Sequence, residues 1–347
     1  MTSASDPYTA PQRWGYIDPN GQLVIPYQFD LAQPHSEGLA PVKAGGRYGY
    51  IDRTGQWVIP PTLESLGPFE GGLATASRDG KDGLIDKTGS FVVPPVFEYV
   101  SSSFQNGLAQ ANTNGLTGYI DRSGKFVIPP QFEFAEEFCD GFARVKDPNK
   151  YEHSWFIDPQ GKMTYGPFDA AEDFSEGWAS VWKNGKCYFI NTKGQTVLEL
   201  PPGVAVGRFK EGLAAADQHP LYPEEASLYG HIDRKGRWVI AAQFDLTGHF
   251  LNGMAHVRVG EKHGMINKQG KYVCPPKYDY LDDMFENRIK FKLGKFQGYC
   301  NEHGEVVIEP IYLLGQRFSE GLAAVCLPGG RDQPLKVFRG EKKKTNQ

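Results

Sequence analysis

The sequence predicts an all-β protein in which nine tandem repeats of about 34 residues stack as a curved β-solenoid. Three observations support this fold class. The 347 residues include 41 glycines and 25 prolines, too many for a helical protein, while 40% are hydrophobic. One sequence motif returns nine times along the chain. Each copy places a turn signal between two apolar runs, a pattern typical of a β-hairpin.

The first motif is clearest in GYIDRTGQWVIPP, residues 49–61. Its copies fill residues 13–338, which we predict to form a single repeat array. Residues 1–12 and the basic segment 339–347 flank the array and are predicted to be disordered tails. The nine copies begin at Gly15, Gly49, Gly83, Gly118, Trp155, Tyr188, Gly230, Gly264 and Gly298.

A second motif recurs once per period and has the sequence FDLAQPHSEGLAPV from Phe29. It carries a phenylalanine in eight of nine periods, and His35 is the exception. A glycine follows three residues later in eight periods, and Arg288 is the exception. The phenylalanines are Phe69, Phe104, Phe138, Phe174, Phe209, Phe250, Phe285 and Phe318.

These two motifs resemble the tandem WG-containing repeat, a bacterial β-repeat family built around W/Y-G-Y-I-D-x-x-G-x-x-V-I-P-P followed by F-S-E-G-L-A. The literal pair occurs once, at Trp14–Gly15. The resemblance covers roughly residues 13–327 and weakens in the fifth and sixth units, where Trp155 and Tyr188 replace the glycine. It implies a β-rich scaffold with no assigned chemistry of its own.

The Asp-x-x-Gly segment at the centre of each unit predicts a type I turn closed by a bulge, with the glycine at positive φ. Asn191, Asn267 and Asn301 replace the aspartate in three units. A turn needs only a short acceptor at this position, whereas a metal ligand or catalytic acid would need the carboxylate. We therefore assign a structural turn role to Asp18, Gly21, Asp52, Gly55, Asp86, Gly89, Asp121, Gly124, Asp158, Gly161, Asp233 and Gly236.

The strand after this turn carries three apolar residues in succession, as in Trp57-Val58-Ile59. Because side chains alternate faces along a strand, both faces should be covered by neighbouring units. Each period should be a three-stranded antiparallel meander, ended by prolines that discourage edge pairing. A closed, propeller-like ring is the alternative to the solenoid. We favour the open array, because nine blades of only three strands would be unusual for a propeller.

Composition excludes several partner classes. The net charge is −4 and the basic residues are scattered, so we expect no nucleic-acid partner. No apolar run reaches the roughly 18–20 residues that span a bilayer, and the N-terminus lacks a signal-peptide pattern. We expect a cytoplasmic monomer without membrane insertion. Five widely spaced cysteines indicate neither disulfides nor a zinc site, and no cofactor or metal is expected.

Candidate binding residues are those that break the repeat. Trp155, Trp178 and Trp182 gather in the atypical fifth unit. Two insertions, residues 146–153 and 217–225, lengthen the period, and insertions in repeat arrays often project from the binding face. They contribute Tyr151, His153, His219 and Tyr222. His249, His256 and His263 are spaced by seven, but we expect intervening turns to separate them.

These observations favour a non-enzymatic scaffold that binds a protein or peptide. The alternatives are a carbohydrate- or small-ligand-binding module and, third, a hydrolase with a propeller-like channel. No convergent set of catalytic side chains is identifiable from the spacing.

Overall fold

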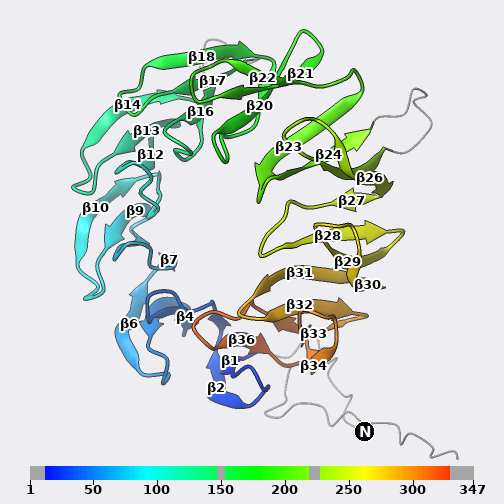
Figure 1. Cartoon of the computed structure of the whole chain (residues 1–347). Coiled ribbons are helices and arrows are strands. Elements are labelled where there is room, and N and C mark those ends of the chain that lie inside the picture. The colour runs from blue at the N-terminus through cyan, green and yellow to red at the C-terminus, as the bar shows by residue number, and fades with distance from the viewer. Residues whose placement is uncertain (1–11, 147–152, 219–226, 329–347) are drawn as a thin grey trace, which may run out of the picture.

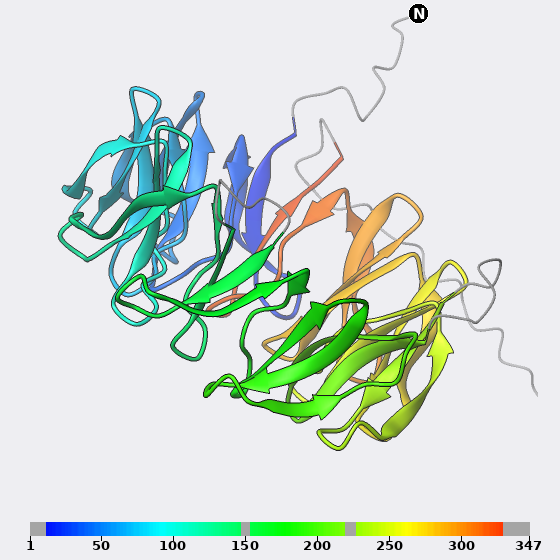
Figure 2. The ribbon, with the colours of Figure 1, turned by 90° about the horizontal axis from the view of Figure 1, so that it is seen from above.

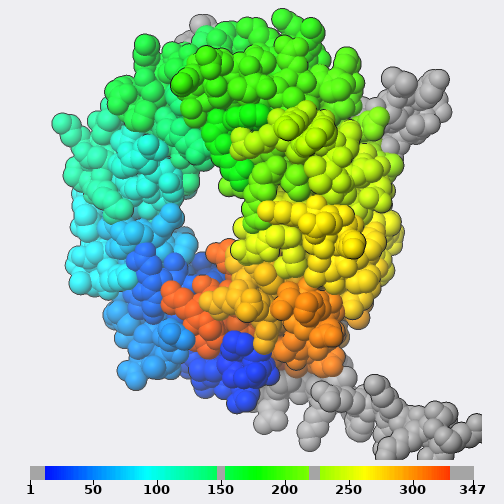
Figure 3. Space-filling model, viewed as in Figure 1, coloured from blue at the N-terminus to red at the C-terminus, as the bar shows by residue number. Residues whose placement is uncertain are grey.

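The protein is a nine-bladed β-propeller in a computed structural model that describes residues 12–146, 153–218 and 227–328. These residues form nine four-stranded antiparallel sheets around a central channel (Figures 1 and 3). The predicted all-β class is confirmed, but the predicted solenoid is wrong: the array closes on itself. Tyr151, His219, Tyr222, residues 1–11 and residues 339–347 lie outside the described residues.

Within blades 1 to 8 the strands run in chain order from the channel to the outer rim (Figure 1). Blades 1 to 3 consist of β3 (Leu31–Ala32), β4 (Ala40–Ala44), β5 (Arg47–Ile51), β6 (Trp57–Leu63); β7 (Ser65–Leu66), β8 (Ala74–Arg78), β9 (Lys81–Ile85), β10 (Phe91–Phe97); β11 (Tyr99–Val100), β12 (Ala109–Thr113), β13 (Leu116–Ile120), β14 (Phe126–Phe132). Blades 4 and 5 consist of β15 (Phe134–Ala135), β16 (Ala143–Lys146), β17 (Ser154–Ile157), β18 (Met163–Phe168); β19 (Ala170–Ala171), β20 (Trp178–Lys183), β21 (Lys186–Asn191), β22 (Thr196–Glu199).

Blades 6 to 8 consist of β23 (Val204–Lys210), β24 (Leu213–Gln218), β25 (Leu228–Ile232), β26 (Trp238–Phe244); β27 (Leu246–Thr247), β28 (Met254–Val259), β29 (Lys262–Asn267), β30 (Tyr272–Tyr278); β31 (Tyr280–Phe285), β32 (Arg288–Leu293), β33 (Phe296–Cys300), β34 (Val306–Tyr312). Blade 9 joins the two ends of the chain and consists of β35 (Leu314–Gly315), β36 (Ala323–Cys326), β1 (Trp14–Ile17), β2 (Leu23–Phe29).

The innermost strand of each blade is the one that the sequence analysis did not predict. In most blades it is only two residues long, such as β3, in which Leu31 and Ala32 pair with Lys43 and Val42. Two residues are too short to show the alternation by which a strand is recognised. The predicted three-stranded unit is therefore corrected to a four-stranded blade, which removes the reason for favouring an open array.

Blade 9 closes the ring by pairing strands from opposite ends of the chain. β1 runs antiparallel to β36, with Trp14 opposite Cys326 and Ile17 opposite Ala323. The blue and red ends of the chain meet in this blade (Figure 1). All three apolar side chains of β1 are buried, with Tyr16 and Ile17 fully so. Closure leaves no unpaired end blade, which an open array would expose to solvent.

The aspartate of each Asp-x-x-Gly turn accepts backbone hydrogen bonds. Asp18 Oδ1 lies 2.9 Å from the Asn20 N and 2.8 Å from the Gln22 N. Asn191 Oδ1 accepts the equivalent pair in blade 5, so an uncharged amide serves as well. The turn glycines have positive φ, as at Gly55 with +87°. A Cβ there would lie 2.9 Å from Ile25 Cγ2 of the neighbouring blade, so the glycine also permits close blade packing.

The glycine at the start of the first motif lies on the third strand and is absent from blades 4 and 5. It allows the outermost strand to pass close to the third strand. A Cβ on Gly49 would lie 2.4 Å from the Ile59 carbonyl oxygen. In blade 4 this position is Trp155, and the glycine has moved to the facing strand. A Cβ on that residue, Gly166, would lie 3.0 Å from Trp155 Cε3. The exchange explains how a tryptophan fits where other blades need a hydrogen.

A buried side chain on the third strand ties five of the nine blades to the next by a hydrogen bond. The Tyr50 hydroxyl donates to the Gly67 carbonyl at 2.5 Å, and its ring lies 4.7 Å from that of Phe69. Burial raises the pKa of Tyr50, so its hydroxyl stays protonated as a donor. In blade 6 the same place is taken by His231, whose Nε2 lies 2.9 Å from the Gly248 carbonyl and whose ring lies 4.7 Å from Phe250.

A second link between blades lies in the loop from the first to the second strand. Its carboxylate accepts hydrogen bonds from the backbone of the same loop in the next blade. Glu37 lies 3.1 Å from the Gly72 N, and Glu320 lies 3.0 Å from the Gly38 N across the closure. Six of the nine junctions carry this contact, made by Glu37, Asp140, Glu176, Glu211, Glu286 and Glu320.

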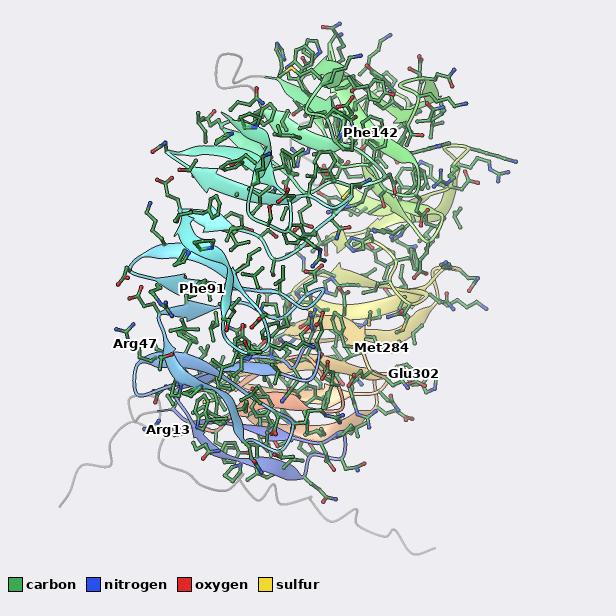
Figure 4. All side chains as sticks on the ribbon, turned by 90° about the vertical axis from the view of Figure 1, so that its left-hand side faces the viewer. Arg13, Arg47, Phe91, Phe142, Met284 and Glu302 are labelled. Carbon is green, nitrogen blue, oxygen red and sulfur yellow. The ribbon has the colours of Figure 1, made fainter. Side chains whose placement is uncertain are left out.

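A cation from the next blade's Asp-x-x-Gly turn often supports this carboxylate. Arg234 Nη2 lies 3.1 Å from Glu176 Oε2 and donates to the Glu176 carbonyl at 2.7 Å. Partial burial opposes ionisation, but the bonds from Arg234 and Gly212 outweigh it and lower the pKa of Glu176. Arg13 and Arg47, which lie at one face of the ring (Figure 4), instead pair with Asp30 and Glu64. Those exposed pairs contribute little to stability.

We predict that Glu176→Ala lowers the free energy of unfolding by about 1 kcal/mol, because the Gly212 and Glu211 amides lose a charged acceptor. Glu176→Gln should lose less, since its amide oxygen can still accept. Urea titration would measure both. Glu261→Ala, an exposed turn residue of blade 7, is the control. Equal stability of E176A and E261A would contradict the role of the carboxylate link.

We also predict that His231→Tyr makes the protein less sensitive to acid. Burial lowers the pKa of His231 to about 4, below its ordinary value of 6.5. The stability gained from the neutral ring is therefore complete above pH 6.5 and is lost as pH falls toward 4. Between pH 7 and 5 this loss is about 2 kcal/mol. Tyrosine should form the bond that Tyr50 makes in blade 1 without this penalty.

The measurement is the free energy of unfolding at pH 7 and pH 5 for the wild type and H231Y. His303→Gln, which removes a histidine with a 68% exposed side chain, should leave the pH dependence unchanged. An H231Y protein that loses as much stability as the wild type over this interval would contradict the assignment.

Candidate functional site

A cavity of about 650 Å³ lies in the central channel. Its wall is formed by the innermost and second strands of blade 8 and by the loops that follow the innermost strands of blades 9, 1 and 2. The opening of the channel is visible in the space-filling view (Figure 3). The cavity therefore sits beside the blade that closes the ring.

Charged and aromatic side chains share this wall. Lys290 Nζ lies 3.0 Å from Asp282 Oδ2. The Arg317 guanidinium lies over the Phe285 ring at 4.5 Å from its centre, a cation–π contact. Burial, and then the charge of Asp282, raises the pKa of Asp283. Asp283 thus differs from its neighbour in having no cation within ion-pair distance among the described residues.

His35 also lines the cavity, and it is the residue that replaces phenylalanine in the second motif. Its side chain is 1% exposed, and its ring lies 4.9 Å from that of Tyr16. Nε2 makes a long contact of 3.4 Å with the Asp52 carbonyl, and Nδ1 has no hydrogen-bond partner within the described parts of the chain. Burial lowers the pKa of His35, so its ring is neutral near pH 7.

Arg288, the other exception to the second motif, lies on the opposite side of the closing blade. Its Nη2 donates to the Pro19 carbonyl in blade 9 at 3.0 Å. In several other blades the residue at the position of Pro19 is a lysine or arginine that reaches the first-to-second-strand loop of the preceding blade. Proline cannot make this contact, so at this junction Arg288 makes it from the loop side. Both sequence exceptions thus flank the closure, which the sequence alone could not show.

The channel wall on blades 4 and 5 is also charged. Arg144 bridges two carboxylates, with Nε 3.0 Å from Asp173 and Nη2 3.1 Å from Glu136. Glu137 accepts hydrogen bonds from Ser101 and Ser103 at 3.4 and 3.3 Å. This wall is therefore acidic, with arginine neutralising part of it.

A second cavity of about 510 Å³ lies between blades 5 and 6. It exists because the outer strand β22 is only four residues long, while the outer strands of seven other blades have seven. The apolar part of its wall is formed by Trp182, Leu200 and Pro201, and the charged part by Lys186 and Glu199. A smaller space of about 290 Å³ adjoins it across Glu199 and Leu200.

The structure does not bring the candidate tryptophans into one site. Trp178 and Trp182 lie at opposite ends of the same stretch of β20, and Trp155 lies in blade 4. Trp178 packs 5.5 Å from Phe209 and under the Arg234 guanidinium, so it serves the blade junction. His153 lies 3.8 Å from Asp169. Among the described candidates, Trp182 alone borders a cavity.

Sequence reasoning missed a histidine pair in blade 7. His256 Nε2 lies 2.6 Å from His263 Nδ1, although we expected turns to separate them. The residues occupy adjacent strands, β28 and β29, joined by a tight hairpin. In the strand register His256 lies opposite Met265 and His263 lies opposite Arg258, so the two rings are diagonal neighbours on one face of the sheet. This diagonal placement is the signal that could have paired them. Burial, and then the charge of His263, lowers the pKa of His256 to about 4.

No group of three or more His, Cys, Asp or Glu side chains within residues 12–146, 153–218 and 227–328 is placed to hold a metal ion. The same residues include no helix with the length and apolar character needed to cross a membrane.

Several solved structures are similar to this chain at low identity. A crystal structure of a eukaryotic initiation factor is 10% identical and has a TM-score of 0.59, covering 91% of this chain and 98% of its own. BamB from Moraxella catarrhalis is 12% identical, with 86% and 96% covered and a TM-score of 0.41. Hsv2p from Kluyveromyces lactis is 6% identical, with 67% and 90% covered and a TM-score of 0.40. At such identity the first likeness shows the fold alone.

No curated protein matches the sequence. The WG containing repeat, in contrast, matches eight segments, at residues 14–48, 48–81, 83–116, 118–151, 156–187, 229–262, 264–295 and 298–330. They cover most of the chain and leave out only the region of the sixth unit, where the resemblance is weakest. The protein belongs to the WG containing repeat family.

Proposed function

We propose that this propeller is a non-enzymatic scaffold that binds a segment of a protein or peptide in the channel cavity of blades 8, 9, 1 and 2. The observation that carries the proposal is the cavity itself, about 650 Å³ and lined by side chains from four blades. Concave sites with an apolar lining and a few convergent polar groups are the usual binding sites of proteins.

The chemistry of the wall supports a peptide as the ligand. Phe69 and Phe285 supply apolar surface, Gln33 and Gln316 can hydrogen-bond to a backbone, and both signs of charge are present. Asp282 is held by Lys290, and Arg317 is held against Phe285. Groups held by such partners suit recognition, which needs fixed contacts, rather than proton transfer.

A small-ligand site is the second candidate function, and the cavity between blades 5 and 6 favours it. Its volume of about 510 Å³ falls within the range of small-molecule sites. The indole of Trp182 could stack on the apolar face of a sugar or another ring. Soluble glycans and nucleotides tested by calorimetry against the wild type and Trp182→Ala would assess this alternative.

We predict that a display library of random 12-residue peptides yields binders whose affinity depends on the channel cavity. Arg317→Glu reverses a charge in the wall and should change their affinity at least tenfold in one direction or the other, or select a different set. Trp182→Ala, in the other cavity, should leave their affinity unchanged. Fluorescence anisotropy with the recovered peptides measures both effects, and thermal unfolding checks that each variant is folded.

The proposal fails if no peptide binds saturably. It also fails if binding is unaffected by the channel variant or is lost only in W182A, which would move the site to the junction of blades 5 and 6.

A further inference from the structure

We propose that the channel cavity selects peptide segments that present a lysine or arginine side chain to Asp283 and Glu70. This inference rests on the proposed function and specifies the chemistry of its ligand. Three observations carry it: the charge of the channel wall, the engagement of its cations, and the replacement of phenylalanine by His35.

The channel wall carries more acids than bases. Asp282 and Asp283, two residues at the end of the inner segment of blade 8, line the cavity. The ionisable residues at the equivalent places of the other blades are Glu136, Glu137, Glu172, Asp173, Arg208, Arg317 and His249. With Glu70, Lys290 and Arg144 included, seven acids stand against four lysines and arginines and one histidine. Field lines in a narrow channel add, so its potential attracts cations.

The cations of the cavity already have partners. Lys290 is paired with Asp282, and Arg317 lies over Phe285. On the far wall, Arg144 is shared by Glu136 and Asp173. Glu70, by contrast, accepts a hydrogen bond only from the Ser103 hydroxyl among the described side chains, at 3.0 Å. Asp283 and Glu70 are therefore the carboxylates in this cavity whose charge a ligand can still neutralise.

Asp283 is held where a bound cation would be most effective. Its surroundings already disfavour its charge, through burial and the neighbouring Asp282. A lysine or arginine brought beside it would remove that penalty as well as add an attraction. The interaction is weakly screened because the cavity wall excludes water from one side.

His35 adds a polar group where eight blades have phenylalanine. Its Nδ1 lacks a hydrogen-bond partner within the described residues, although an unsatisfied buried nitrogen is costly. Because His35 is only 1% exposed, the ring must turn toward the cavity before a ligand can supply the missing partner. A polar peptide segment is therefore favoured over an apolar one. Among the residues of the phenylalanine column that line the cavity, His35 is the one that is not phenylalanine.

The experiment uses the full-length protein and the peptides recovered by display. Binders should be enriched in lysine and arginine, and replacing those residues with methionine should weaken binding at least tenfold. Asp283→Asn and Glu70→Gln keep the shape of each side chain and should each weaken basic peptides about tenfold. Arg317→Gln should leave their affinity unchanged or raise it. Glu261→Gln, on an exposed turn of blade 7, is the matched control. Affinity should fall as salt increases.

The outcomes separate this inference from the proposal beneath it. Binders that are acidic or uncharged, and that R317Q weakens while D283N does not, overturn the charge preference but leave a peptide site in the channel. Basic peptides that bind D283N and E70Q as well as they bind E261Q also overturn it. If spermidine binds and no peptide does, both this inference and the peptide function fall.

His35→Phe restores the residue of the other eight blades and provides a separate test. It should fold at least as stably, because it removes an unsatisfied nitrogen, while weakening basic peptides several-fold. Unchanged affinity would show that the imidazole has no part in recognition.

Discussion

The antiparallel pairing of β1 with β36 is the contact on which the rest of the ring depends. The other eight blades are each continuous in the chain, whereas blade 9 is assembled from both ends. Only when it forms can Glu320 accept from the Gly38 N, and Ser319 donate to the His35 carbonyl at 2.6 Å. The same pairing brings blades 8 and 1 within reach of a common cavity, so closure creates the candidate site as well as the fold.

Much of each blade follows from local sequence, and little of the ring does. The Asp18–Gly21 turn, the apolar strand after it and the proline stops are short-range signals that any one repeat contains. Closure is a single long-range pairing, and the segment around Trp14 has the same pattern whether or not it finds β36. The site shares this limitation. His35 and Arg288 stood out in the alignment of repeats, but their position beside the closure depends on the curvature of the ring.

Carboxylates divide into two groups on this scaffold. Those of the inter-blade loops, such as Glu176, accept hydrogen bonds from amides of the next blade and form an ion pair with a cation from its turn. Those that face the channel do not bind the next blade's loop amides: Asp282, Glu136 and Asp173 pair with cations of the wall, and Asp283 has no such ion pair among the described residues. The repeat therefore fixes the ring with one acidic position and leaves the other free to vary, so that blades can differ in what they present without weakening the junctions between them.

Blade 9 also sets an order of events during synthesis. β1 and β2 leave the ribosome first, yet the strand that β1 must pair with is the last to appear. A two-stranded hairpin is marginal in water by itself, and domains made of distant segments cannot complete early. Until β36 arrives, Trp14, Tyr16 and Ile17 are covered within their own blade by β2 alone. The edge of β1 therefore stays unpaired while eight further blades are translated. Premature pairing of this edge with another nascent copy is the characteristic hazard of the fold.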